Sequence, residues 1–192
     1  MQTARNTYSR RPKESHAETV LYEIDLLRFA RDRLLSPQQW WTDRDEWVYL
    51  EDFLLHYRNL IDFFGMPEPK VRGDDLSILH PEAIWSVPVP EKAVLDSMTK
   101  PDLWEKYSSG RNDEAISKYL HHCTTKRLEA KAWEIETMYE ELRPVLEDFE
   151  RLLPAYLPTD ALTKTYGVID DGLCGNSTTS TRILGSGWNP TK

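Results

Sequence analysis

Cysteine is scarce in this chain and poorly placed for cross-linking or metal binding. Cys123 and Cys174 are its two cysteines among 192 residues, and they lie far apart. No Cys-x-x-Cys pair occurs, which argues against both a disulfide framework and the usual zinc-binding pattern. Glycine-rich phosphate loops and other cofactor motifs are missing as well. We therefore expect a protein of a reducing cytoplasm that uses no cofactor and no metal.

Long hydrophobic runs are also missing. Nowhere do about 18 apolar residues follow one another, which is roughly what a membrane-spanning helix needs. The bases near the N-terminus are not followed by the apolar core of a signal peptide. We therefore expect a cytoplasmic protein that does not cross a membrane.

The charge is acidic overall but unevenly distributed. The formal net charge is −8, whereas residues 1–13 carry four bases and no acid, and residues 164–192 carry three bases and two acids. Subtracting the +5 of these two ends leaves −13 for residues 14–163. A body this acidic repels phosphate backbones, so broad binding to DNA or RNA is not expected.

The strongest signal in the sequence is the stretch 45–64, DEWVYLEDFLLHYRNLIDFF. At about 100° per residue, a set of apolar side chains of this stretch falls on one broad face. The set is Trp47, Leu50, Phe53, Leu54, Tyr57, Leu60, Ile61 and Phe64. This arc spans roughly half of the helix circumference, so the pattern predicts a helix that is buried on more than one side.

Capping signals and periodicity predict further helices at 15–36, 99–108, 112–123 and 127–153. The short link 37–42 favours an antiparallel hairpin between the first two helices. Six of the twelve prolines fall in residues 65–101 and predict a long irregular crossover. We expect one all-α domain at 14–158, a bundle of four or five helices, between a flexible basic arm at 1–13 and a flexible Gly/Ser/Thr-rich tail at 159–192.

The last predicted helix carries two further features. Its acidic face is expected to be solvated, because the sequence has no Glu-x-x-His pair that would indicate a di-iron site. Pro144 lies inside its apolar stripe, where proline removes an N–H and clashes with the preceding turn. We expect a kink or a new start of the helix there.

His56 is at the centre of the best polar constellation in the sequence. Asp52, His56 and Asn59 line up at i, i+4 and i+7, and the carboxylate favours a protonated imidazole. Two interpretations remain open: a general base, and a histidine at the margin of the apolar face that hydrogen-bonds its neighbours. Arg58 points about 160° away from His56. Asp62 at i+4 makes an ion pair the expected role of Arg58.

Other candidate residues are two histidines and an aspartate pair. His121 and His122 close the helix predicted at 112–123, where a histidine can belong to a site or simply be favoured by the helix dipole. They project about 100° apart, so at most one can face a shared site. Asp74 and Asp75 could bind a hard cation such as Mg²⁺, or could cap a turn.

Residues 50–64, LEDFLLHYRNLIDFF, resemble the signature helix of a group of uncharacterised bacterial all-helical proteins. In that group a similar helix is followed by an Asp-Asp pair, and later by a Lys-x-Leu-x-His-like segment and a Lys-x-Trp. Asp74-Asp75, residues 117–122 and residues 131–133 stand here in the corresponding order. The resemblance covers residues 14 to about 153 and implies a helical fold, but it brings no assigned activity.

More distantly, the order of the helices resembles the HEPN superfamily, helical bundles that include RNA-cleaving toxins and defence proteins. Their ribonuclease motif is an arginine followed by a histidine one to two turns later on a late helix. No predicted late helix matches it, since Lys118 and His122 have the wrong base and the wrong spacing. Arg10 and Arg11 precede His16 at fitting distances, but Pro12 intervenes and the residues lie where the chain enters the first predicted helix.

Two functions remain as hypotheses. The first is a non-catalytic interaction protein that binds a protein partner or a second copy of itself. The second, implied by the HEPN resemblance, is a metal-independent ribonuclease or an inactive relative in a toxin-antitoxin or defence system. It would use His56 and His122 as acid and base, with Asn59 or Arg58 nearby.

Overall fold

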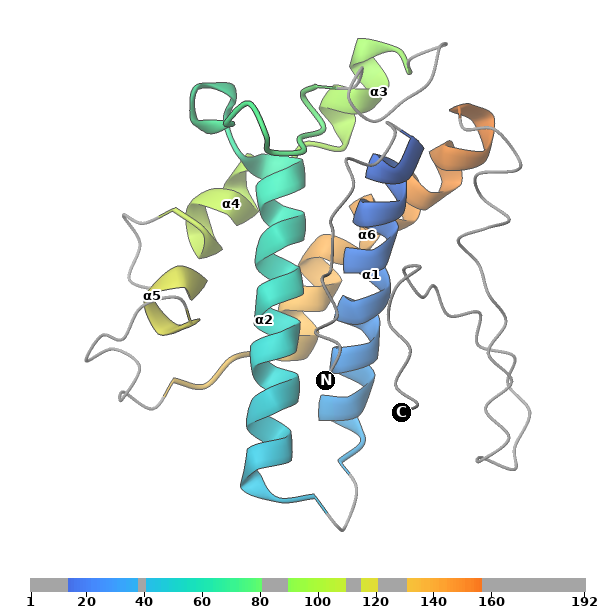
Figure 1. The fold of residues 1–192 in the computed structure, drawn as a ribbon. Helices are drawn as coiled ribbons and strands as arrows, with labels where there is room; N and C mark the ends of the chain where they lie inside the picture. The colour runs from blue at the N-terminus through green and yellow to red at the C-terminus, as the bar shows by residue number, and fades with distance from the viewer. Residues whose placement is uncertain (1–13, 38–40, 81–89, 110–114, 121–130, 157–192) are drawn as a thin grey trace, which may run out of the picture.

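The computed structural model describes residues 14–37, 41–80, 90–109, 115–120 and 131–156. All regular secondary structure in these ranges is helical, and no strand occurs in them (Figure 1). The elements are α1 (Glu14–Leu35), α2 (Asp43–Gly65), the 3-10 turn η1 (Glu68–Lys70), α3 (Lys92–Ser97), α4 (Pro101–Tyr107), α5 (Ile116–Leu120) and α6 (Ile135–Tyr156). The predicted all-α bundle is therefore confirmed. The predicted arm at 1–13 and the whole of the predicted tail at 159–192 lie outside the described residues.

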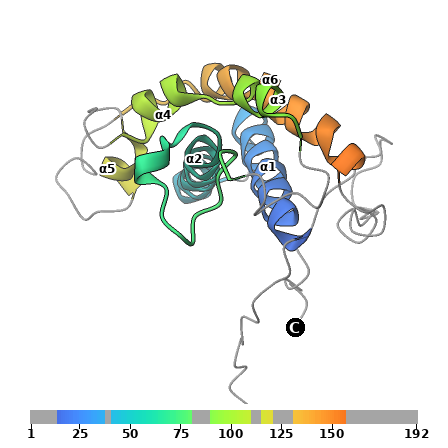
Figure 2. The ribbon, with the colours of Figure 1, turned by 90° about the horizontal axis from the view of Figure 1, so that it is seen from above.

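The hairpin predicted for the first two helices is also confirmed. α1 and α2 run antiparallel, side by side, in both views (Figures 1 and 2). α6 runs obliquely behind this pair, and α3, α4 and α6 form an arc along one side of it (Figure 2). α4 and α5 both contact α2. The central helix is thus covered from several directions, as its wide apolar arc predicts.

The core lies where α6 meets the C-terminal half of α2. Phe149 of α6 places its ring edge-on to the rings of Phe63 and Phe64, with both centroid distances 5.6 Å. All three side chains are buried. Further buried residues of α6 are Met138, Leu142, Val145, Leu146 and Leu153. This apolar stripe is what attaches α6 to the hairpin, since burying one large apolar side chain contributes roughly 1.5–3 kcal/mol.

The predicted start of the last helix was wrong. α6 begins at Ile135 and not at residue 127, because residues 131–134 are not helical. It continues through Pro144 without a new start, and the neighbouring Val145 and Leu146 are buried. A kink at Pro144 stays a prediction. α5 covers Ile116–Leu120 of the predicted 112–123, and the ends of that range lie outside the described residues.

The start of α2 is set by a capping box formed by Thr42 and Asp45. The Asp45 carboxylate accepts hydrogen bonds from the backbone N–H and the hydroxyl of Thr42, both at 2.7 Å. These hydrogen bonds lower the pKa of Asp45. Thr42 is therefore the N-cap, and α2 begins at Asp43.

The other end of α2 is capped by parts of the chain that are distant in sequence. The N–H of Ile78 donates to the carbonyl of Phe63 at 3.0 Å, and the N–H of Lys100 donates to the carbonyl of Phe64 at 2.9 Å. Both carbonyls would otherwise have no partner within the helix. The irregular segment after α2 and the start of α4 are thus tied to the end of α2.

None of the helices in the described ranges is both long and apolar enough to cross a membrane.

Gly65 permits this close approach, and its replacement should be costly. A Cβ at position 65 would lie 2.2 Å from the backbone oxygen of Lys100 and 2.8 Å from Cβ of Trp104. We expect Gly65→Ala to lower the free energy of unfolding by about 1–3 kcal/mol in spite of the better helix propensity of alanine. Urea denaturation measures the change. The matched control is Gly73→Ala, where nothing lies within 4 Å of the added Cβ. Equal stability of the two variants would contradict the prediction.

Candidate functional site

His56 lies between two carboxylates at the interface of α1 and α2. Its Nδ1 is 2.6 Å from a carboxylate oxygen of Glu23 on α1, and its Nε2 is 3.2 Å from one of Asp52 on α2. The His56 side chain is only 6% exposed. The i, i+4 contact with Asp52 was predicted from the sequence, whereas the Glu23 contact was not.

Two further side chains complete the surroundings of the imidazole. Asn59 donates from Nδ2 to the same Glu23 oxygen at 2.9 Å. The ring of Tyr22 meets the His56 ring edge-on, with centroids 6.0 Å apart and an angle of 86° between the planes. The predicted alignment of Asp52, His56 and Asn59 on one side of α2 is therefore confirmed. His56 and Asn59 both contact Glu23 of the neighbouring helix α1.

This environment fixes the protonation state of His56. Burial by itself lowers the pKa of the imidazole, but the hydrogen bonds to Asp52 and Glu23 outweigh burial and raise the pKa to about 9. At neutral pH the ring is therefore an imidazolium that donates both of its N–H groups to carboxylates. An imidazolium has no lone pair with which to accept a proton, so this arrangement suits a structural ion pair and not a general base.

Arg58 lies on a different side of α2, as its spacing from His56 predicts. Its Nε is 3.5 Å from a carboxylate oxygen of Asp62, and the hydroxyl of Ser108 donates to the other oxygen of Asp62 at 2.5 Å. Burial raises the pKa of Asp62, opposed by the Ser108 hydrogen bond and the Arg58 charge. The expected ion pair within α2 is confirmed and is half-buried, and the Ser108 hydrogen bond to Asp62 joins α2 to the end of α4. Arg58 and His56 are not brought together.

Of the remaining predicted candidates, the structure describes only Asp74 and Asp75. His121 and His122 lie outside the described residues. Asp75 caps a turn by accepting a hydrogen bond from the N–H of Arg72 at 2.9 Å, which is the second of the two roles considered for it. Asp74 is exposed. Among the residues that the structure describes, no three His, Cys, Asp or Glu side chains form a group that could hold a metal ion.

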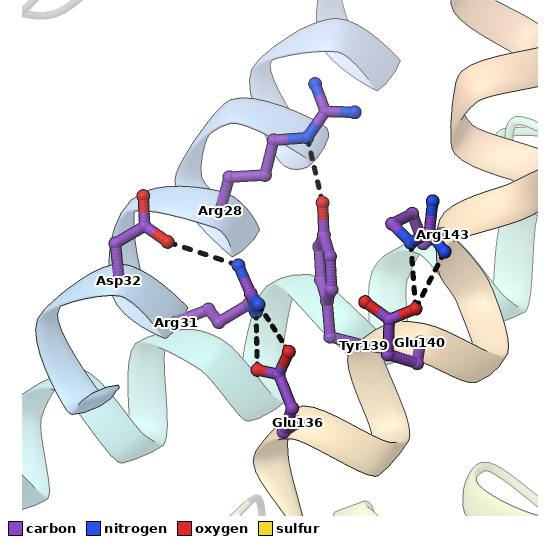
Figure 3. Close-up of polar contacts among 7 residues, drawn as sticks. All are labelled: Arg28, Arg31, Asp32, Glu136, Tyr139, Glu140 and Arg143. Atoms are coloured by element: carbon purple, nitrogen blue, oxygen red, sulfur yellow. Dashed lines mark hydrogen bonds and ion pairs between the residues drawn. The ribbon is translucent and has the colours of Figure 1, made fainter. Parts of the chain in front are cut away.

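The acidic face of α6 is in part an interface between helices. The Arg28 guanidinium of α1 binds Glu150 through two hydrogen bonds of 2.6 and 2.8 Å. Its Nε also donates to the hydroxyl of Tyr139 at 3.3 Å (Figure 3). Arg31, one turn away, binds Glu136 at 2.5 and 2.9 Å (Figure 3). Some of the acids expected to be solvated therefore hold α6 against α1.

A small surface hollow is the feature that sequence reasoning missed entirely. It is lined by Trp47, Leu50, Glu51, Leu54, Tyr119, Leu120, Lys131 and Trp133, and its free volume is about 30 Å³. A hollow of this size accommodates small groups such as water and is far too small for a nucleotide. The lining comes from α2, from α5 and from the segment before α6, three stretches whose meeting no sequence spacing reveals.

The pH dependence of stability tests the state of His56. The raised pKa means that the imidazolium stabilises the fold fully below its usual value of 6.5, and that this contribution is lost as the pH rises through about 9. We expect the free energy of unfolding to fall by ~2–3 kcal/mol across this window in the native sequence, but not in His56→Gln. Urea denaturation between pH 6 and 10 measures it. The control His16→Gln, which alters a histidine of α1, should retain the loss. Parallel profiles for the native sequence and His56→Gln would refute the assignment.

Comparison of the chain with protein-family models, with curated proteins and with solved structures finds no match. The resemblances described for its sequence therefore remain predictions. Function has to be argued from the geometry of the described residues, of which the carboxylate-bound His56 and the aromatic hollow are the most distinctive features.

Proposed function

We propose that this chain is a non-catalytic helical-bundle interaction protein. The observation that carries the proposal is the environment of His56, the best catalytic candidate in the sequence. Both of its ring nitrogens face carboxylates, its side chain is 6% exposed, and its pKa is raised to about 9. A group held in this way stabilises the α1–α2 hairpin and is not available to a substrate.

An exposed apolar surface on α2 supports a role in binding another polypeptide. Trp47 and Val48, in the first half of α2, are 59% and 57% exposed, whereas the second half of the helix is mostly buried. Exposed apolar patches on a charged surface are typical of interaction sites, and tryptophan is among the residues that dominate binding energy. The partner is a protein or a second copy of the chain.

A ribonuclease is the alternative function. It needs a base and a cation at one phosphodiester. His56 is bound by Glu23 and Asp52, whose charges repel a phosphate, and Arg58 is engaged by Asp62 on another side of α2. These contacts favour the non-catalytic proposal.

An RNA cleavage assay separates the two functions. We expect single-stranded RNA to stay intact with high concentrations of the purified protein in EDTA, because the base is protonated and engaged. Gel electrophoresis of the RNA over several hours measures cleavage. Cleavage by the native sequence that disappears in His56→Gln, while circular dichroism shows that the variant is still folded at the assay temperature, would overturn the non-catalytic proposal.

Site-specific photo-cross-linking in the native host tests the interaction surface. A photoreactive residue at position 44, one turn before Val48 and exposed, should cross-link to one defined polypeptide. Val48→Glu should abolish the cross-link, because burying a carboxylate against an apolar surface is costly. The matched control places the same residue at Thr137, an exposed position of α6. Identical products from positions 44 and 137, or no effect of Val48→Glu, would contradict the assignment of this face.

A further inference from the structure

We propose that the aromatic hollow between α2, α5 and the segment before α6 is a binding site for an alkylammonium group, which the side chain of Lys131 occupies in the present structure. The inference rests on the geometry of the hollow alone and does not depend on the proposed interaction function. Choline-like small molecules and trimethylated lysine side chains share the chemistry that such a site recognises.

Two aromatic rings form perpendicular walls around one ammonium. The rings of Tyr119 and Trp133 have centroids 5.4 Å apart and planes at 85° to each other. Nζ of Lys131 lies 4.7 Å from the Tyr119 centroid and 4.0 Å from the Trp133 centroid. Both distances are within the ~6 Å range in which a ring face attracts a cation. The hollow therefore already holds a cation in the manner of an aromatic cage.

Side chains of α2 also line the hollow. Trp47 adds a third aromatic ring, Leu50 and Leu54 add apolar surface, and Glu51 adds a carboxylate. Three aromatic side chains with one acid are the combination that binds quaternary ammonium groups, because the rings replace part of the hydration shell and the acid supplies charge. The net charge of −13 over residues 14–163 further favours a cation.

The ordinary interpretation is that Lys131 simply packs on neighbouring rings, as surface cations often do. The cation–π contacts of Arg33 and Lys70 lie on the surface of other elements and bring the cation to the ring of Phe29 and of Trp104, respectively. Lys131 lies over two rings, inside a hollow with a third aromatic residue and a carboxylate. This convergence distinguishes the hollow from a chance contact.

Lys131 acts as a built-in competitor for the ligand. The Lys131 ammonium already lies over both rings, so an external ammonium group can take this position only when Lys131 leaves. Lysine has a flexible stem and a strongly hydrated head group, so it can move out into solvent. Removing the lysine side chain should therefore strengthen binding.

Calorimetric titration tests the proposal with choline and with its neutral carbon analogue, 3,3-dimethylbutanol. We expect Lys131→Ala to bind choline at least about fivefold more tightly than the native sequence, which corresponds to ~1 kcal/mol. The neutral analogue should show no such gain, because it lacks the charge that the rings attract. Lys118→Ala, which removes the same charge from α5, is the matched control and should show no gain.

Substitution of an aromatic wall is the second arm of the experiment. Trp133→Leu should abolish choline binding. Trp133→Phe, which keeps a ring, should weaken choline binding at least about twofold. The phenylalanine variant provides the test if the leucine variant does not fold. Comparing choline with N-acetyl-trimethyllysine amide distinguishes a free small molecule from a modified peptide as the source of the ammonium. Equal binding of choline and its neutral analogue, or no gain in Lys131→Ala, would overturn the proposal.

Discussion

Burial of α2 is the constraint that the rest of the fold satisfies. Its apolar arc is too wide for one partner, and α1, α4, α5 and α6 all contribute to covering it or the core beside it. The packing is tightest near its C-terminus, where Phe63 and Phe64 meet Phe149 and where Gly65 touches the backbone of Lys100. Two backbone carbonyls at this end are capped from distant segments, so the irregular chain between α2 and α4 is held in place by the same helix.

Two polar side chains buried along α2 are paired with partners from neighbouring helices. A helix covered from several sides also buries some of its polar side chains, and a buried charge without a partner costs several kcal/mol. His56 is compensated by Glu23 and Asp52, and Asp62 by Arg58 and Ser108. Each set joins α2 to a different neighbour, α1 in the first case and α4 in the second. Residues that look catalytic in the sequence thus orient the helices of this bundle.

Ion pairs and hydrogen bonds also hold the acidic helix α6 against α1 and α4. α6 is rich in carboxylates, yet Glu136 and Glu150 face arginines of α1, and Glu141 accepts a hydrogen bond from Lys106 of α4 at 2.8 Å. These contacts surround the buried stripe of α6 and reduce the repulsion that its charge would otherwise cause. The same acidity attracts cations and repels phosphates, which is consistent with the ammonium site proposed around Lys131.

Much of the fold was readable from the sequence because it depends on local spacing. The helix at 45–64, the hairpin of α1 and α2, and the line of Asp52, His56 and Asn59 all follow from periodicity, capping or i, i+4 geometry, and all are present. The extent of α6 was misjudged, because a helix-like pattern before Ile135 does not form a helix in its tertiary surroundings.

What only the tertiary structure decided is which distant side chains meet. Three such contacts join different elements. Glu23 pairs with His56, and Arg28 pairs with Glu150. The third is the hollow lined by Trp47, Tyr119, Lys131 and Trp133. Spacing within a helix determines the direction of a side chain, and for that reason the sequence alone determined the helices and their polar lines. The rotation and offset of one helix against another depend on the sum of many packing contacts, which no local periodicity encodes.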